Sequence, residues 1–115
     1  MTISSAGFYF NGNDDEAELN TATGAYENGF TVDGDDGNGS TFSGARLRAN
    51  KASACVGQGF AVINQAGETR LTRNTASGNS VDYCDAGLRT VLDNDNAFGT
   101  TATQCLISRG DPVAP

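Results

Sequence analysis

Side chains that carry oxygen alternate with glycine in one short stretch, Asp33-Gly34-Asp35-Asp36-Gly37-Asn38-Gly39-Ser40. Carboxylate and amide oxygens at this spacing resemble the ligand half of a calcium-binding loop, in which glycine permits the sharp turns. The bidentate glutamate that completes an EF-hand loop is missing. The candidate calcium ligands are Asp33, Asp35, Asp36 and Asn38. The alternative is a loop inserted between two strands, with Gly and Asp serving as turn residues.

Arginine supplies the candidate ligand-binding residues, which are Arg46, Arg48 and Arg70. Arg46 and Arg48 flank Leu47, so a strand that turns Leu47 inward turns both arginines to solvent. Stacked on neighbouring strands, the arginines would bind an anion or an acidic sugar, which makes carbohydrate an expected class of partner. The alternative is a solvated face, on which the arginines pair with acids of adjacent strands.

Several kinds of catalytic chemistry are excluded by composition. The chain contains no His, so it has no Ser-His-Asp triad and no imidazole metal ligand. It contains no Trp, the commonest platform for stacking a sugar. A carboxylate pair for glycoside hydrolysis remains available, because Asp93 and Asp95 are two residues apart and would lie on one side of a strand. Nothing distinguishes this pair from other surface acids, so the sequence predicts no catalytic residue.

A short repeated unit must position these side chains. The segment Asn20-Thr21-Ala22-Thr23-Gly24 reappears as Asn50-Lys51-Ala52-Ser53-Ala54 and as Asn74-Thr75-Ala76-Ser77-Gly78, with a looser copy from Asn94 to Gly99. A Gly-Phe pair precedes the first three copies, at positions 7, 29 and 59. A fixed unit with loops of variable length is the signature of a solenoid.

Alternating apolar residues within each unit predict short strands with one face buried. If each unit is one turn of a parallel β-coil, equivalent residues lie about 4.8 Å apart on neighbouring turns. The asparagines Asn20, Asn50, Asn74 and Asn94 (or Asn96) would then form a ladder of side-chain amides.

The pattern Gly-Phe-x-Val, a loop and Leu-x-x-Asn-x-Ala-Ser resembles the right-handed parallel β-helix repeat family. The stretch from Cys84-Asp85 through Val91-Leu92-Asp93-Asn94 and Phe98-Gly99-Thr100 to Cys105-Leu106 is similar to the last coil that closes many secreted bacterial members. The resemblance covers roughly residues 7 to 107, although members are usually far longer, and it brings no catalytic residue with it.

This resemblance implies an all-β chain that forms a short right-handed parallel β-helix of about four coils. The expected coils are 7–28, 29–58, 59–80 and 81–107, with a tail at 108–115, all within one domain spanning 1–115. The last coil would cap the C-terminal end, whereas no cap is recognisable at the N-terminal end. An uncapped coil leaves unpaired backbone groups that invite another chain.

The cysteines predict one disulfide. Cys84 and Cys105 are 21 residues apart, about one coil, so stacked copies would lie within the Cα range of a disulfide. A Cys84–Cys105 bridge indicates an oxidising compartment. Cys55 is left over, as a buried apolar residue or a free thiol. Three cysteines without histidine are a poor zinc set.

Charge is distributed unevenly within a net value of −7. Residues 1–45 hold eight acids and no base, whereas residues 46–73 hold five bases and one acid. An acidic chain repels nucleic acid, and no apolar run is long enough to span a bilayer. No signal peptide is visible, but the richness in Gly, Asn, Thr and Asp is typical of secreted or cell-surface proteins. A cytoplasmic location is the alternative.

Two classes of function follow. The first is a non-enzymatic structural or binding module of extracellular type, which stacks on a partner or on another copy through its open first coil. The second is a polysaccharide-active lyase or hydrolase, or a fragment of one, acting along the face that carries Arg46, Arg48 and Arg70. The shortness of the stack favours the first, because four coils offer little groove.

Overall fold

Parallel strands stack in register to form three sheets. The structure is a computed structural model that describes residues 2–4, 7–103, 105–108 and 111–113. Its regular elements are all strands, with no helix among the described residues, so the chain is all-β as predicted. The sheets are here named A, B and C. Sheet A contains β1 (Thr2–Ser4), β4 (Thr21–Thr23), β7 (Lys51–Ser53), β10 (Thr75–Ser77) and β13 (Ala97–Phe98). Sheet B contains β2 (Phe8–Phe10), β5 (Phe30–Asp33), β8 (Gln58–Ile63), β11 (Val81–Asp85) and β14 (Thr101–Ala102). Sheet C contains β3 (Glu16–Glu18), β6 (Arg46–Arg48), β9 (Arg70–Thr72) and β12 (Val91–Leu92).

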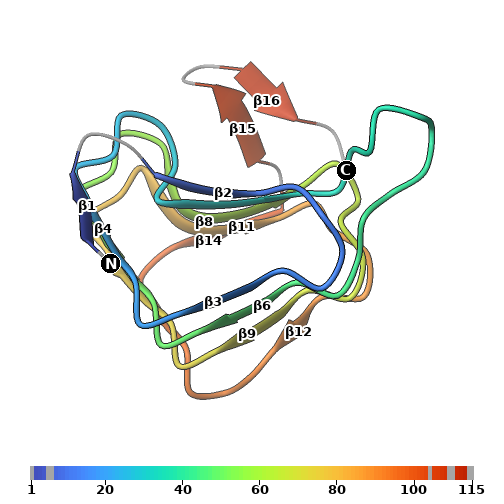
Figure 1. Ribbon diagram of the computed structural model, residues 1–115. Coiled ribbons are helices and arrows are strands. Elements are labelled where there is room, and N and C mark those ends of the chain that lie inside the picture. Colours follow the sequence, from blue (N-terminus) through green and yellow to red (C-terminus); the bar gives the residue numbers. More distant parts are fainter. Residues whose placement is uncertain (1, 5–6, 104, 109–110, 114–115) are drawn as a thin grey trace.

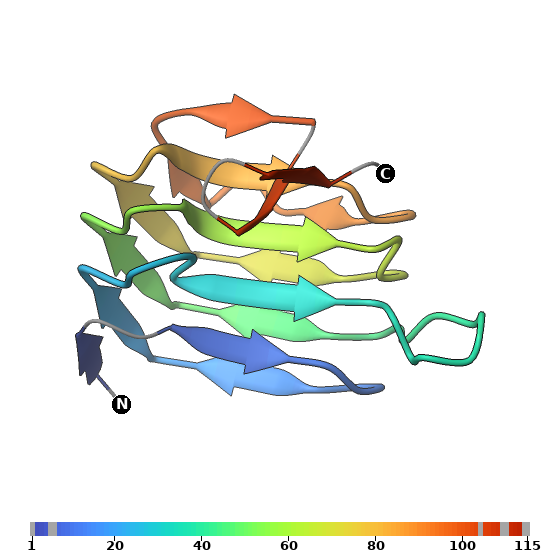
Figure 2. The ribbon, with the colours of Figure 1, turned by 90° about the horizontal axis from the view of Figure 1, so that it is seen from above.

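The chain visits sheets B, C and A in turn and then begins again. β2, β3 and β4 form the first such unit, and β5–β7, β8–β10 and β11–β13 form the next three. Within each sheet the strand order follows the chain order, so every unit lies directly on the one before it (Figures 1 and 2). Side chains of one repeat position therefore meet their counterparts above and below.

The core consists of columns of like residues. Phe8, Phe30 and Phe60 are in register, and their rings stack with centroids 4.9 and 4.7 Å apart. Leu47 and Leu71 are in register on adjacent strands of sheet C and are fully enclosed. Parallel pairing in register places such residues one strand spacing apart, which suits offset stacking of aromatic rings. The repeat visible in the sequence is thus the repeat of the packing.

An asparagine column forms the corner between sheets C and A. The Oδ1 atoms of Asn50, Asn74 and Asn96 each accept hydrogen bonds from the backbone N and the Nδ2 of the asparagine one unit earlier, at 2.8–3.2 Å. The first donor is Asn20. The fourth member is Asn96, so the assignment of Asn94 to this column is wrong. Asn94 is exposed, because it precedes the corner by two residues.

Left-handed backbone makes the same corner turn sharply. It occurs at the residue before each of the first three asparagines, with φ of 59° at Leu19, 55° at Ala49 and 53° at Arg73. Residues with side chains seldom adopt this conformation, and it persists where surrounding contacts hold it. The amide column that follows supplies those contacts.

Glycine at the start of the sheet B strands is explained by close packing. A Cβ atom on Gly59 would lie 2.6 Å from the carbonyl oxygen of Asp82 and 2.9 Å from the Cβ of Ala76. A Cβ on Gly29 would lie 2.8 Å from the Cβ of Ala52. Cβ atoms are not found at such short distances from neighbouring atoms. The glycine of the repeated Gly-Phe pair is therefore explained by the tight corner between sheets A and B.

The C-terminal segment leaves the stack and covers one of its sides. β15 (Cys105–Ser108) and β16 (Asp111–Val113) form an antiparallel hairpin over the outer face of sheet B (Figures 1 and 2). A second apolar cluster lies on this outer face and contains Ala61, Ile63, Cys84 and Cys105. The expectation of one buried face is therefore wrong for sheet B, in which all six residues of β8 are buried.

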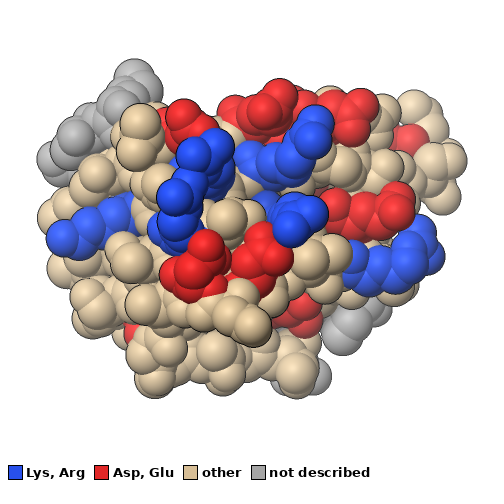
Figure 3. Space-filling view, turned by 90° about the horizontal axis from the view of Figure 1, so that it is seen from below, with Lys and Arg blue, Asp and Glu red and all other residues tan. Residues whose placement is uncertain are grey.

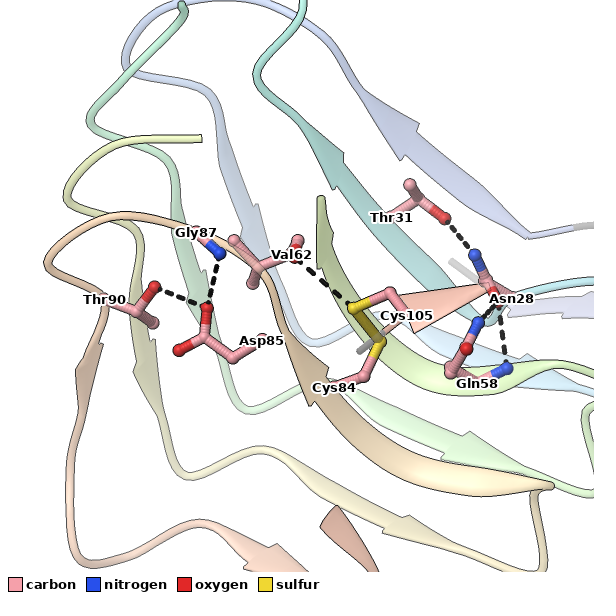
Figure 4. The surroundings of a disulfide bond; sticks show 9 residues. All are labelled: Asn28, Thr31, Gln58, Val62, Cys84, Asp85, Gly87, Thr90 and Cys105. Atoms are coloured by element: carbon pink, nitrogen blue, oxygen red, sulfur yellow. Dashed lines mark hydrogen bonds between the residues drawn. A yellow bond between two sulfur atoms is a disulfide. The ribbon is translucent and has the colours of Figure 1, made fainter. Parts of the chain in front are cut away.

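The predicted Cys84–Cys105 disulfide is confirmed, but its geometry differs from the expected one (Figure 4). The residue stacked on Cys84 in the next strand is Ala102. Cys105 instead approaches from the hairpin, with a Cα–Cα distance of 5.4 Å. The bridge thus fastens the hairpin to the outside of sheet B. Cys55 is buried with a free thiol.

Candidate functional site

On the outer face of sheet C, acidic and basic side chains lie next to one another in rows that run across the strands (Figure 3). One row runs Glu16, Arg46, Arg70 across three strands in register, and the row beside it runs Glu18, Arg48, Thr72. These residues come from β3, β6 and β9, whose inward residues are the enclosed Ala17, Leu47 and Leu71. Burial of the apolar residue in each strand therefore places the polar or charged residue on either side of it at the surface.

Two ion pairs link neighbouring strands on this face, one within a row and one from a row to Asp93. Arg48 Nη1 lies 3.3 Å from Glu18 Oε2. Arg70 binds Asp93 through two contacts, Nε to Oδ2 at 3.0 Å and Nη2 to Oδ1 at 3.2 Å, and the Thr72 hydroxyl donates to Oδ2 at 2.6 Å. The hydrogen bond from Arg70 lowers the pKa of Asp93, and the same contact raises the pKa of Arg70. Asp93 therefore stays ionised.

Arg46 differs from its neighbours. It is exposed and forms no ion pair with any side chain that the structure describes, although Glu16 and Arg70 flank it in register. Beside it lies a shallow hollow of about 440 Å³, lined among others by Arg48, Arg70 and Arg73. The three arginines predicted as ligand-binding residues are thus brought together, but two of them already hold carboxylates.

The acidic loop at 33–40 protrudes from the stack between β5 and β6 (Figure 2). Asp33 Oδ1 accepts from the backbone N of Asp35 and from Asn64 Nδ2, both at 2.9 Å, while Asp33 Oδ2 accepts from the Tyr9 hydroxyl. Asp35 Oδ1 accepts from Gly37 N.

Further along the same loop, Asp36 Oδ1 accepts from the backbone N atoms of Asn38 and Ser40, at 2.7 and 3.1 Å. These contacts are those of turn residues capping their own loop. Among the described residues, no three Asp, Glu or Cys side chains converge as a metal site.

The acidic pair considered for hydrolysis is engaged in structural contacts. Asp93 holds Arg70 and Thr72, and Asp95 Oδ1 accepts from the backbone N of Arg73 at 3.0 Å. Both carboxylates therefore tie the fourth unit to the third.

The edge of β3 is open on the side away from β6. Arg46 N donates to Asp15 O at 2.8 Å and Leu19 N donates to Arg48 O at 3.2 Å, so Asp15, Ala17 and Leu19 turn their backbone groups toward β6. Parallel pairing alternates, so the backbone groups of Glu16 and Glu18 point the other way. No described strand pairs with β3 on that side.

At the opposite end of the stack, the described residues leave β12 without a covering strand as well. Leu92 continues the column of Leu47 and Leu71, yet it is 44% exposed where they are 2% and 0% exposed. The C-terminal hairpin lies beside the stack rather than over this end (Figure 2). The cap expected from residues up to 107 is therefore a cover for sheet B and not for the end of the stack.

Glu16 and Glu18 were missed as members of the site. Their signal was present in the sequence, because Glu-Ala-Glu at 16–18 precedes its corner asparagine at the same distance as Arg-Leu-Arg at 46–48. Aligning the units on the asparagines would have placed the acids beside the arginines.

Comparison with known proteins identifies no relative of this chain. Searches against protein-family models, curated proteins and solved structures find no significant match. None of the described segments is a helix with the length and apolar character needed to cross a membrane.

Proposed function

We propose that the chain is a short right-handed parallel β-helix of about four coils. The order of strands in the three sheets and the in-register columns support this reading. The handedness is supported by a general rule, since connections between parallel strands of one sheet are right-handed in almost every known case. In such a stack the first and last strands of each sheet have a free edge, whereas in a closed barrel every strand is paired on both sides.

The function that we propose is that of a non-enzymatic binding or assembly module of extracellular type. The module docks an extended segment of a partner, or of another copy, on the open first coil by β-strand addition. The observation that carries this proposal is the edge of β3, where the backbone groups of Glu16 and Glu18 face no strand in the part of the chain that the structure describes. The disulfide between Cys84 and Cys105 supports an oxidising location.

The test uses two labelled peptides that copy strands of the chain itself, residues 44–53 and residues 14–23. Fluorescence anisotropy with the purified protein measures their binding, and light scattering measures self-association. We expect at least one peptide or a second copy to bind. The Glu16→Pro variant should lose that binding, because proline removes an N–H that faces the open edge and leaves the pairing with β6 intact. Binding that Glu16→Pro leaves unchanged would contradict docking at this edge.

A second candidate function is supported by the hollow beside Arg46, which forms no ion pair with any described side chain. In this reading, the face binds or acts on an acidic polysaccharide. Titration with an oligouronate tests it. Arg46→Gln should weaken binding by severalfold, whereas Lys51→Gln on sheet A should have no effect. If the titration produced neither a calorimetric heat of binding nor a change in NMR chemical shifts, this candidate function would be ruled out.

A further inference from the structure

We propose that the open edge of β3 selects a basic extended segment, with Arg or Lys at alternate positions, and rejects a second copy of this chain. This inference rests on the proposed docking function and specifies its partner. The occupant would add parallel to β3 and place its two basic residues opposite Glu16 and Glu18.

The fold itself shows how such a segment pairs. On the occupied side of β3, the strand in register is β6, whose Arg46 and Arg48 lie opposite Glu16 and Glu18. One of these pairs closes to 3.3 Å, between Arg48 and Glu18. The two glutamates are exposed and project from the face of the sheet, within reach of the strand position on either side. A second Arg-x-Arg strand would therefore meet the same pattern on the open side.

Neither edge strand of sheet C in a second copy suits that position. The strand at the same end of a second copy is β3 itself, which would oppose Glu16 and Glu18 with the same two acids. The strand at the other end is β12, followed by Asp93, which would fall opposite Glu18. Like charges directly opposite one another on paired strands are destabilising. The acids thus disfavour stacking of identical copies, a common use of charge on edge strands.

The experiment compares the two peptides on the intact protein. The basic peptide, residues 44–53, contains Arg46 and Arg48, and the acidic peptide, residues 14–23, contains Glu16 and Glu18. We expect the basic peptide to bind at least roughly tenfold more tightly, because two exposed pairs change from attraction to repulsion. The difference should shrink as salt is added, since exposed pairs are screened.

Variants with reversed charge test whether Glu16 and Glu18 cause the preference for the basic peptide. The double variant Glu16→Lys/Glu18→Lys should lose the basic peptide and gain the acidic one. The neutral variant Glu16→Gln/Glu18→Gln should narrow the difference between the two peptides, and it replaces the charge-reversed variant if that variant does not fold. Glu27→Lys is the matched control, because Glu27 is an exposed acid between sheets A and B, and it should leave the preference unchanged.

The outcomes separate this inference from the proposed function. Equal binding of both peptides by the unmodified protein, lost in Glu16→Pro, would overturn the charge preference and leave docking at the edge intact. A homo-oligomer that Glu16→Pro dissolves would likewise identify a second copy as the occupant and overturn this inference alone. A monomer that binds neither peptide would overturn both.

Discussion

A buried side-chain amide in the asparagine column both accepts and donates hydrogen bonds. Asn74 accepts from Asn50 through Oδ1, and its Nδ2 donates to the carbonyl of Leu47 at 2.8 Å and to Asn96 Oδ1 at 3.2 Å. The side chain is fully buried, so none of these groups can turn to water instead. Asparagine at this corner is thus required by hydrogen bonding.

Replacing Asn74 with Ala should cost about 1–3 kcal/mol of unfolding free energy, because buried partners lose their hydrogen bonds. Chemical denaturation measures the change. Asn94→Ala is the matched control, since Asn94 is exposed and outside the column, and it should shift the midpoint little. Equal effects of the two substitutions would remove the column from the structural explanation of the repeat.

The contact between Arg70 and Asp93 makes a prediction about pH. Arg70, with help from Thr72, holds the pKa of Asp93 below its ordinary value. A carboxylate with a depressed pKa contributes stability above about pH 4, and this contribution is lost as pH falls through the lower pKa of the folded state.

Arg70→Gln should therefore raise the pKa of Asp93 in an NMR titration and make unfolding less dependent on pH in acid. Arg46→Gln is the control on the same face, because Arg46 does not contact Asp93, and the Asp93 titration should be unchanged. An Asp93 pKa that Arg70→Gln leaves in place would assign the shift to other groups.

Among the elements, the C-terminal hairpin is the one most dependent on a single covalent bond. The Cys84–Cys105 bridge closes a loop of 21 residues and holds β15 over the apolar outer face of sheet B. A loop of this length corresponds to about 3 kcal/mol of stabilisation on the chain-entropy model.

We expect a reductant to lower the melting temperature and to increase binding of an apolar dye, because Ala61 and Ile63 lose their cover. The double variant Cys84→Ala/Cys105→Ala should melt at the lower temperature with or without reductant. Cys55→Ala keeps the bridge and should still respond to reductant as the unmodified protein does. A reductant effect that persists in the double variant would show that the bridge is not its source.

Elements that repeat could be predicted from the sequence, whereas those that occur once could not. The strands containing Leu47 and Leu71 were predictable because a buried apolar residue recurs at a fixed distance from an asparagine. The hairpin has no counterpart in the other units, so nothing in the repeat indicated where it folds. The pairing of Cys84 with Cys105 was predicted from a spacing of one coil, which the structure does not use.

The candidate site was only partly predictable, for a related reason. The alternation of arginine with buried leucine correctly predicted that Arg46, Arg48 and Arg70 share one outer face. Their charge partners could not be predicted in the same way, because these depend on the register between units. A shift of two residues separates Asn94 from Asn96, and in the register that the structure adopts it is Asp93 that meets Arg70. Register of the fourth unit was ambiguous because its copy of the repeat is the loosest.

At the scale of the whole molecule, stability should vary along the stack. Each unit contacts its immediate neighbours, so a central unit is held from two sides and an end unit from one. The exposure of Leu92 against the enclosure of Leu71 in the same column shows the difference directly. Docking at an end would add the missing neighbour.

The matched pair Leu71→Ala and Leu92→Ala tests this gradient. Leu71→Ala leaves a cavity in the closed core and should cost about 2–5 kcal/mol, whereas Leu92→Ala should cost well under half of that, since the side chain is 44% exposed. Denaturant unfolding at low protein concentration measures both. Equal costs would mean that the end carrying Leu92 is covered in solution. If the cost at Leu92 then rose with protein concentration, the cover would be another copy seated on β12, and association would involve the apolar end of the stack rather than the acidic edge of β3.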